Sequence, residues 1–242
     1  QRADSPEGAE SDTNLPDVRP SDRAVAVAVS DLHLSDAAPV WRSNEPCWYE
    51  AQARQLLEMD LLAKSLGGVP ILVAGDVFHR WNPSPKLINF ALTHLPHCYA
   101  VPGQHDLRHH SLDDIKDTAY WTLCSAGKIT NLKAGLPHAV GKLLLWSFPW
   151  GIEPSPKPAH ALLDGIHVAV IHKYVCTKKH HHPGAPESSR LKNVRPTLEG
   201  YDVAVFGDNH LSFIDNDHEC KVVNCGSFYR RNSDQKDYCP MA

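Results

Sequence analysis

Five short segments of acidic and histidine residues each follow an apolar run, and they constrain the fold more than any other feature of the chain. The segments are Asp31-Leu32-His33, Gly75-Asp76, Gly103-Gln104-His105-Asp106, Ile171-His172-Lys173 and Gly207-Asp208-Asn209-His210. The apolar runs before them have the pattern of buried strands. Open α/β sheets build their sites at the carboxyl ends of neighbouring strands. We therefore expect these segments to meet at one edge of a sheet.

The remaining pattern indicates an α/β fold. β-prone runs at 24–29, 69–74 and 98–101 alternate with helical patterns at 47–66, 86–95 and 113–124. Later β-prone runs follow one another at 142–148, 166–171, 202–206 and 221–223, with Pro/Gly/Ser-rich stretches between some of them. This change of rhythm predicts two packed sheets flanked by helices rather than a simple doubly wound sheet.

Length and composition limit the class of protein. With 242 residues, 42% of them hydrophobic, the chain can bury the core of a large domain. Residues 1–22 are polar and acidic, so we expect a disordered or loosely attached segment before a domain spanning 23–242. Neither a secretory signal nor a membrane span is indicated, and the seven scattered cysteines are typical of reduced thiols in a cytoplasmic protein. A net charge of −4 excludes a global attraction to nucleic acid or anionic membrane.

The five segments carry the ligand types of a two-metal centre. Asp76 follows a strand and a glycine, so we expect it to bridge two ions roughly 3.5–4 Å apart. Asp31 and His33 are two residues apart, and in an extended chain both would face the same way and bind the first ion together with His210. The predicted ligands of the second ion are Gln104, His172 and Asp208. Mixed carboxylate and imidazole ligands suit Mn²⁺, Fe²⁺ or Zn²⁺ and argue against Ca²⁺.

Each segment taken alone has an ordinary structural explanation. Asp31 and His33 could form a polar turn, Asp76 could cap a helix, and His172 could be a structural histidine. The tract His180-His181-His182 lies in a Pro/Gly loop, and we expect it to be solvated. The joint occurrence of five such segments after five strand patterns favours the metal centre.

Further candidates would act on a substrate. His105 is the candidate general acid, placed to protonate a leaving oxygen, with Asp106 orienting its ring; a surface turn is the alternative. His109 is a candidate substrate contact because it lies close to His105 in the chain; a solvated surface position is the alternative. Arg230 and Arg231 could reach a phosphate or form a solvated charge pair.

In these motifs the chain resembles the calcineurin-like metallophosphoesterases. The pattern of that family is D-x-H, G-D, G-N-H-D/E, an isolated H and G-H-x-H, and it spans residues 24–230 here. The second motif, Gly75-Asp76-Val77-Phe78-His79 followed by Asn82-Pro83-Ser84, is similar to the DNA-repair exonuclease branch, the SbcD-type nucleases that partner an SMC-like ATPase. It lacks the G-D-x-x-D-R-G continuation of Ser/Thr protein phosphatases. The later Asn224-Cys225-Gly226-Ser227 is similar to a turn of repair-nuclease and phage-encoded members.

The resemblance implies a four-layer α-β-β-α sandwich of two mixed β-sheets flanked by helices, with two divalent metal ions. Mn²⁺ is the first expectation, and Fe²⁺, Zn²⁺ or Mg²⁺ are alternatives. The implied metal ligands are Asp31, His33, Asp76, Gln104, His172, Asp208 and His210, and His105 takes the place of the catalytic histidine. The implied activity is hydrolysis of phosphodiesters in DNA, as a nuclease or exonuclease. The resemblance also implies an SMC-like ATPase partner and a homodimer, and no association with a membrane.

Two departures from the family pattern fall on the second ion, and they keep other functions open. Gln104 replaces Asn with the same amide oxygen, and Asp208 replaces the first His of G-H-x-H. A charged oxygen in place of a neutral nitrogen should favour harder ions such as Mn²⁺ over Zn²⁺. The chain is also short for the repair-nuclease branch, which is typical of a minimal phage-like nuclease. The alternatives are a phosphomonoesterase, a small-molecule phosphodiesterase or a scaffold protein on a degenerate site.

Overall fold

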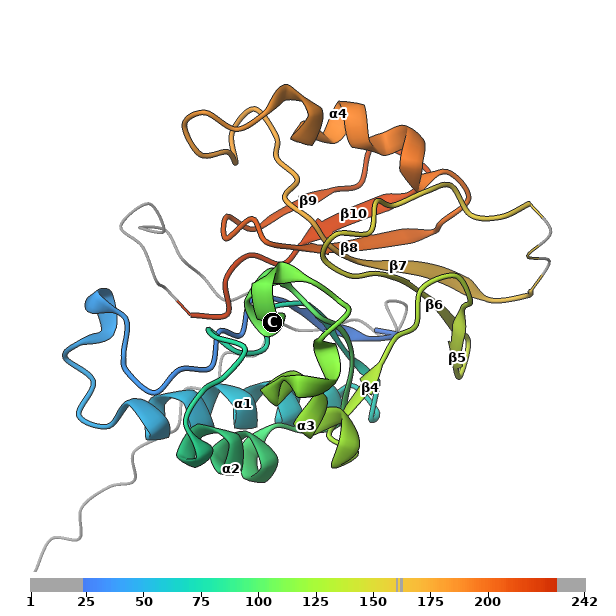
Figure 1. Cartoon of the computed structure of the whole chain (residues 1–242). Coiled ribbons are helices and arrows are strands. Elements are labelled where there is room, and N and C mark those ends of the chain that lie inside the picture. The colour runs from blue at the N-terminus through green and yellow to red at the C-terminus, as the bar shows by residue number, and fades with distance from the viewer. Residues whose placement is uncertain (1–23, 160, 162, 230–242) are drawn as a thin grey trace, which may run out of the picture.

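The computed structural model describes residues 24–159, 161 and 163–229 and consists of two β-sheets packed face to face between layers of helices (Figure 1). The predicted segment 1–22 lies outside the described residues. Among the helices that are described, none combines the length and the apolar character needed to cross a membrane.

The first sheet is built from the first half of the chain and is parallel throughout. Its strands, in spatial order, are β1 (Val27–Val29), β2 (Ile71–Ala74), β3 (Cys98–Val101) and β4 (Ile129–Asn131). The helices that connect them are α1 (Trp48–Ser65), α2 (Pro85–His94) and α3 (Ala119–Ser125). Each helix returns the chain to the same end of the sheet, which makes the strands parallel. All three helices lie on the face of this sheet that points away from the second sheet (Figure 1).

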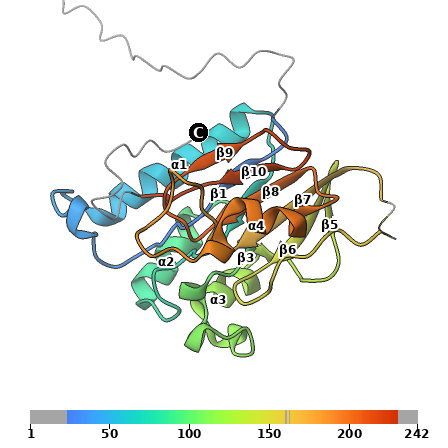
Figure 2. The ribbon, with the colours of Figure 1, turned by 90° about the horizontal axis from the view of Figure 1, so that it is seen from above.

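The second sheet is mixed and has the order β5-β6-β7-β8-β10-β9 (Figure 2). Its strands are β5 (His138–Val140), β6 (Leu143–Phe148), β7 (Ile166–His172), β8 (Val203–Gly207), β9 (Phe213–Asp215) and β10 (Lys221–Asn224). The four inner strands are parallel, whereas the edge strands β5 and β9 are antiparallel to their neighbours. The short helix α4 (Leu191–Val194) covers the outer face.

Apolar side chains fill the spaces between the layers. Leu72 of β2, Leu145 of β6 and Val170 of β7 belong to the core between the two sheets. Leu56 of α1 and Tyr120 of α3 belong to the core between the first sheet and its helices. Strands β2 and β6 are buried at every position because both of their faces are covered. The predicted α-β-β-α sandwich is therefore confirmed.

The structure differs from the sequence prediction in the pairing of the first sheet and in the start of α3. The first sheet is not mixed, because every connection within it is a helical crossover. The helix expected at 113–124 is interrupted by a 3₁₀ turn at Ile115–Asp117, and α3 starts only after Thr118. The Thr118 hydroxyl accepts a hydrogen bond from the Trp121 amide, so Thr118 is a helix cap and not a helix-interior residue.

Candidate metal centre

The predicted ligands lie after the carboxyl ends of strands in both sheets. Asp31, Asp76 and Gln104 follow β1, β2 and β3, whereas His172 ends β7 and Asp208 follows β8. The Asp208 amide donates to Asp31 Oδ2 over 3.0 Å, which joins the two sheets at this edge. The structure thus brings together the segments that the sequence predicted to meet.

Four of these residues have a left-handed backbone. Their φ angles are 53° at Asp31, 42° at His33, 53° at Asp76 and 80° at Asp208. The conformation costs a non-glycine residue on the order of 1–3 kcal/mol, and residues that adopt it cluster at functional sites. The extended backbone expected between Asp31 and His33 is therefore wrong. The two side chains still converge because the chain turns sharply where the His33 amide donates to the Asp76 carbonyl, over 2.8 Å.

The first set of ligands consists of Asp31, His33 and His210. Oδ1 of Asp31 is 3.6 Å from Nε2 of His33 and 3.4 Å from Nε2 of His210. The two imidazole Nε2 atoms are 3.3 Å apart. Burial raises the pKa of Asp31, but the neighbouring imidazoles of His210 and His33 outweigh it and hold that pKa well below its usual range. Asp31 is therefore a carboxylate surrounded by imidazoles.

Asp76 stands between this set and the second one. Its Oδ2 is 3.6 Å from Nε2 of His33, and its Oδ1 is 3.6 Å from Nε2 of His172. Burial raises the pKa of Asp76 well above its usual range, and the negative charges of Asp31 and Asp106 add to the effect. A nearby cation would reverse this preference and keep both buried carboxylates ionised.

The second set consists of Gln104, His172 and Asp208. The Gln104 amide donates from Nε2 to Asp208 Oδ1 over 2.8 Å, which places its Oε1 2.6 Å from Nε2 of His172. Nδ1 of His172 donates to the Ala74 carbonyl over 2.6 Å, so Nε2 presents a lone pair. Oε1 of Gln104 and Nε2 of His172 are thus two acceptor atoms in contact, which is stable only with a cation or a proton between them. The carbonyl that orients His172 is the usual outer partner of a metal-bound imidazole.

Two further observations show that these residues fit a pair of divalent cations. Oδ1 of Asp31 and Oδ2 of Asp76 are buried without a hydrogen-bond partner, and a cation would satisfy both. Glycines let the ligands approach the backbone: a Cβ at Gly75 would overlap the His172 ring, and one at Gly103 would overlap the Asp76 carboxylate. The residues present, four carboxylate or amide side chains and three imidazoles, are ligands that first-row divalent ions accept.

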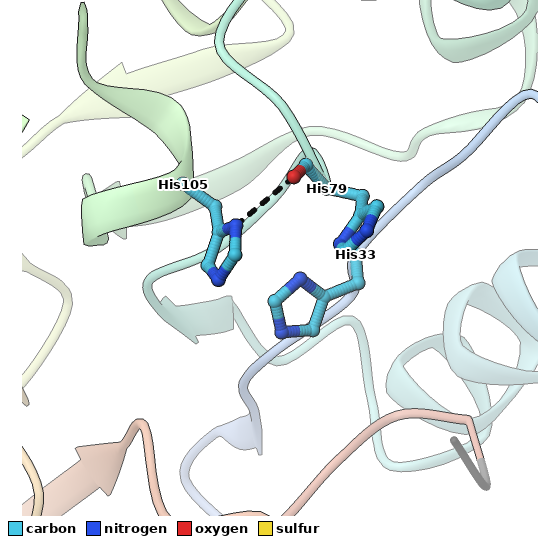
Figure 3. A group of neighbouring side chains, drawn as sticks. All are labelled: His33, His79 and His105. Carbon is cyan, nitrogen blue, oxygen red and sulfur yellow. Dashed lines mark hydrogen bonds between the residues drawn. The ribbon is translucent and has the colours of Figure 1, made fainter. Parts of the chain in front are cut away.

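His105 lies at the rim of this centre. Its amide donates to Asp76 Oδ1 over 2.9 Å, and its ring Nδ1 donates to the His79 carbonyl over 3.0 Å (Figure 3). That bond turns Nε2 toward Asp76, with 3.9 Å to Oδ2. The side chain is 39% exposed, whereas those of Asp76 and His33 are 1% and 2% exposed. A substrate at the metal centre can therefore reach the His105 ring.

Asp106 does not orient the His105 ring, and that prediction is wrong. Its carboxylate accepts hydrogen bonds from the backbone amides of Val77, Phe78 and Gly103, over 3.1, 2.9 and 3.0 Å. Burial raises the pKa of Asp106 to about 6, and these three donors oppose the rise. Asp106 therefore fixes the loop that carries Asp76. The ring of His105 is oriented by the His79 carbonyl instead.

Comparison with known proteins identifies the family. The sequence profile described as calcineurin-like phosphoesterase matches residues 25–212, which is more than half of the chain. The chain belongs to the calcineurin-like phosphoesterase family. No curated protein matches it. The members of this family are metal-dependent hydrolases that use two divalent ions, in agreement with the two ligand sets described above.

Solved structures resemble the phosphoesterase at low sequence identity. A sulfate thiohydrolase from Thermus thermophilus has a TM-score of 0.50 and 13% identity, over 88% of this chain and 53% of its own. A phosphopantetheinyl hydrolase from Mycobacterium tuberculosis has a TM-score of 0.48 and 15% identity, over 89% and 93%. A dimetal phosphatase from Danio rerio has a TM-score of 0.48 and 10% identity, over 84% and 87%. The first of these likenesses supports the fold and says nothing of the substrate.

His79 is a site residue of this phosphoesterase for which no role was predicted. Its ring is stacked on that of His105 at 5.3 Å and 21°, and it meets the edge of the His33 ring at 5.5 Å (Figure 3). The three imidazoles have nitrogen atoms close enough to share one ion. The sequence feature that could have pointed to His79 is its position three residues after Asp76, in the same loop.

Asn209 is a second residue without a predicted role. Its side-chain amide is buried and donates to the carbonyls of Val175 and His180, over 2.7 and 3.1 Å. Asn209 lies between Asp208 and His210, so these bonds anchor the loop that supplies ligands to both sets. They also order part of the histidine tract: His180 is half-buried and stacks on Phe213 at 5.5 Å. The prediction of a solvated tract is therefore wrong for His180.

The predicted substrate contacts have different outcomes. His109 is exposed and has a left-handed φ of 52°. It lies four residues beyond His105, at the same edge of the molecule, and its contact with a substrate stays a prediction. Arg230 and Arg231 lie outside the described residues.

Proposed function

We propose that this phosphoesterase is a DNA nuclease that hydrolyses phosphodiesters with two bound divalent cations, Mn²⁺ first among them. The observation that carries the proposal is the position of the Asp76 carboxylate, 3.6 Å from an imidazole of each ligand set. A shared carboxylate is what a two-metal site requires. His105, whose amide donates to that same carboxylate, supplies an imidazole at its exposed side.

In this proposal the protein residues hold the cations and move one proton. Asp31, His33 and His210 would hold one ion and Gln104, His172 and Asp208 the other, with Asp76 shared. Bound cations would acidify a water molecule and neutralise the phosphoryl oxygens. His105 would protonate the leaving oxygen from Nε2, while the His79 carbonyl keeps the second ring proton on Nδ1.

DNA is proposed as the substrate because of the second and third motifs. The run from Gly75 to His79 with the following Asn-Pro-Ser, and a third motif ending in Asp106, are similar to the repair-nuclease branch. Exposed Arg108 and His109 lie just after this third motif and could contact phosphates. A homodimer and an SMC-like ATPase partner belong to the same proposal, as does a cytoplasmic location.

A phosphomonoesterase or a small-molecule phosphodiesterase is the second candidate. The chain has 28 acidic and 24 basic residues, whereas DNA-binding domains usually carry an excess of basic residues. A small phosphoester needs the metal centre alone and no basic surface. A scaffold protein is disfavoured because each predicted ligand position still carries a coordinating side chain.

The test is hydrolysis of end-labelled single-stranded and double-stranded DNA with and without Mn²⁺, by the wild type and by His105→Ala. The matched control is His97→Ala, because His97 is an exposed histidine just before β3, at the strand end opposite to the centre. Cleavage that needs both Mn²⁺ and His105 supports the nuclease. Hydrolysis of bis-p-nitrophenyl phosphate or p-nitrophenyl phosphate without DNA cleavage supports the second candidate. A folded protein that hydrolyses none of these substrates with two ions bound contradicts both.

A further inference from the structure

Trp150 lies beside the metal centre and has no part in the chemistry proposed above. Strand β6 is parallel to β7 with Phe148 opposite Ile171, so Trp150 follows β6 at the same edge where His172 ends β7. The Trp150 amide donates to the Pro102 carbonyl over 3.1 Å. Pro102 directly follows β3. Trp150 is therefore held between the strand ends that supply Gln104 and His172.

The indole ring of Trp150 is flanked by two imidazoles. Its centroid is 6.4 Å from that of His172, at an interplanar angle of 61°, and 6.4 Å from that of His110, at 86°. Trp150 is half-buried, so part of the residue is open to solvent. A large aromatic residue that lies beside a predicted metal ligand and is not fully buried is suited to contact the organic part of a phosphoester.

The segment that carries His110 has an unusual backbone. His109 and His110 are consecutive left-handed residues, with φ of 52° and 56°. Two adjacent non-glycine residues in this region cost on the order of 1–3 kcal/mol each, and such strain is concentrated at ligand sites. Arg108, the preceding residue, lies over the Trp81 ring at 5.5 Å. The segment thus combines basic side chains with two tryptophans, the combination that binds nucleotides without sequence preference.

We propose that Trp150 and His110 form a stacking subsite for the base of a nucleotide whose phosphate lies at the metal centre. This inference rests on the proposed function only in requiring that a phosphate binds there. The ring of Trp150 touches that of His172, and the base is the flat aromatic part of a nucleotide, attached to its phosphate through one sugar. Every base has a π-face, so the subsite would accept all four bases.

The test measures binding, and it does not depend on turnover. The probes are a thymidine nucleotide analogue in which CH₂ replaces the ester oxygen, and methylphosphonate as its counterpart without base and sugar. Their dissociation constants are measured by calorimetry on the Mn²⁺-loaded protein, for the wild type, Trp150→Ala, Trp150→Phe and the control Trp121→Phe. Trp121 lies on α3, in the helical layer outside the first sheet.

We expect Trp150→Ala to weaken binding of the nucleotide analogue roughly tenfold and to leave methylphosphonate unchanged. Trp150→Phe keeps a ring and should lose no more than about threefold, with Trp121→Phe equal to the wild type. Equal weakening of both probes would overturn the inference, because Trp150 would then act through His172. Equal affinity of the wild type for both probes, or no effect of Trp150→Ala, would also overturn it. A wild type that binds neither probe would instead contradict the proposed function, and the subsite with it.

Discussion

The two ligand sets of the centre differ in how their side chains are partnered. In the first set, the imidazoles of His33 and His210 both face one oxygen of Asp31 that has no hydrogen-bond partner. In the second set, Gln104 and Asp208 are hydrogen-bonded to each other, and His172 supplies a single imidazole. The first set therefore surrounds a carboxylate oxygen that lacks a hydrogen-bond partner. In the second set, Gln104 and Asp208 already have hydrogen-bond partners without an ion.

The difference predicts a tight first site and a weaker second site with more oxygen ligands. An ion in the first site would give the buried Asp31 oxygen the partner that it lacks, which favours binding. An ion in the second site competes for the Asp208 oxygen that Gln104 already contacts. Both departures from the family pattern, Gln104 and Asp208, belong to this second set. Four experiments would break or sharpen the contrast.

Removing the shared carboxylate should have the largest effect. Asp76→Asn keeps a residue that tolerates the left-handed backbone, so the loop should be preserved. We expect the rate of phosphodiester hydrolysis to fall on the order of 10³-fold or more, because both ions lose a ligand. The metal-free variant should melt at a higher temperature than the metal-free wild type, because burial disfavours the charge of Asp76. A folded variant with wild-type activity would contradict the bridging role.

Breaking one set at a time compares the two sites directly. We expect His210→Ala to lower the rate about 100-fold and Asp208→Asn about tenfold at limiting Mn²⁺, because the first site is the tighter one. Raising the Mn²⁺ concentration should restore Asp208→Asn more completely than His210→Ala. The measurement is the rate as a function of Mn²⁺ concentration for both variants. Equal losses with equal rescue would show that the two sites are equivalent.

Restoring the family pattern should change the choice of metal. Asp208→His replaces a charged oxygen with a neutral nitrogen, and softer ions prefer nitrogen. We expect the ratio of Zn²⁺ to Mn²⁺ affinity to rise about tenfold, with little change for His97→Ala as the control. Competition between the two ions, followed by equilibrium dialysis, gives the ratio. An unchanged ratio would mean that Asp208 does not contact an ion.

The pH dependence of metal stabilisation should be a smaller effect with a definite sign. The pKa of Asp76 is raised in the metal-free fold, so its protonated form stabilises the metal-free protein at low pH, and that stabilisation is lost as the pH rises through the raised value. The pKa of Asp31 is lowered, so its contribution is lost only below its usual range, in acid. The increase in melting temperature caused by Mn²⁺ should therefore grow as the pH rises above the usual range of a carboxyl group, and should grow less steeply in Asp76→Asn. An increase that shrinks with pH would contradict the role of Asp76.

Much of the fold and the convergence of the site could be predicted from the sequence, because both follow from local patterns. Buried strands read as continuous apolar runs, and the carboxyl ends of parallel strands meet at one edge, which placed Asp31, Asp76 and His172 together. The role of Asp106 could not be predicted, because its partners are backbone amides of a loop 28 and 29 residues earlier in the chain. The left-handed turn at His33 and the stacking of His79 depend on packing between loops in the same way. The edge strands β4, β5 and β9 could not be predicted because each has three residues of mixed polarity, whereas the equally short β1 lies within a longer apolar run.

The most direct measurement is the number of Mn²⁺ ions bound per chain, by equilibrium dialysis and elemental analysis of the wild type and Asp76→Asn. Two ions per wild-type chain, with one affinity clearly tighter than the other, and a loss of at least one ion in Asp76→Asn are the expected results. A folded wild-type chain that binds one ion or none at saturating Mn²⁺ would contradict a two-metal centre built on Asp76.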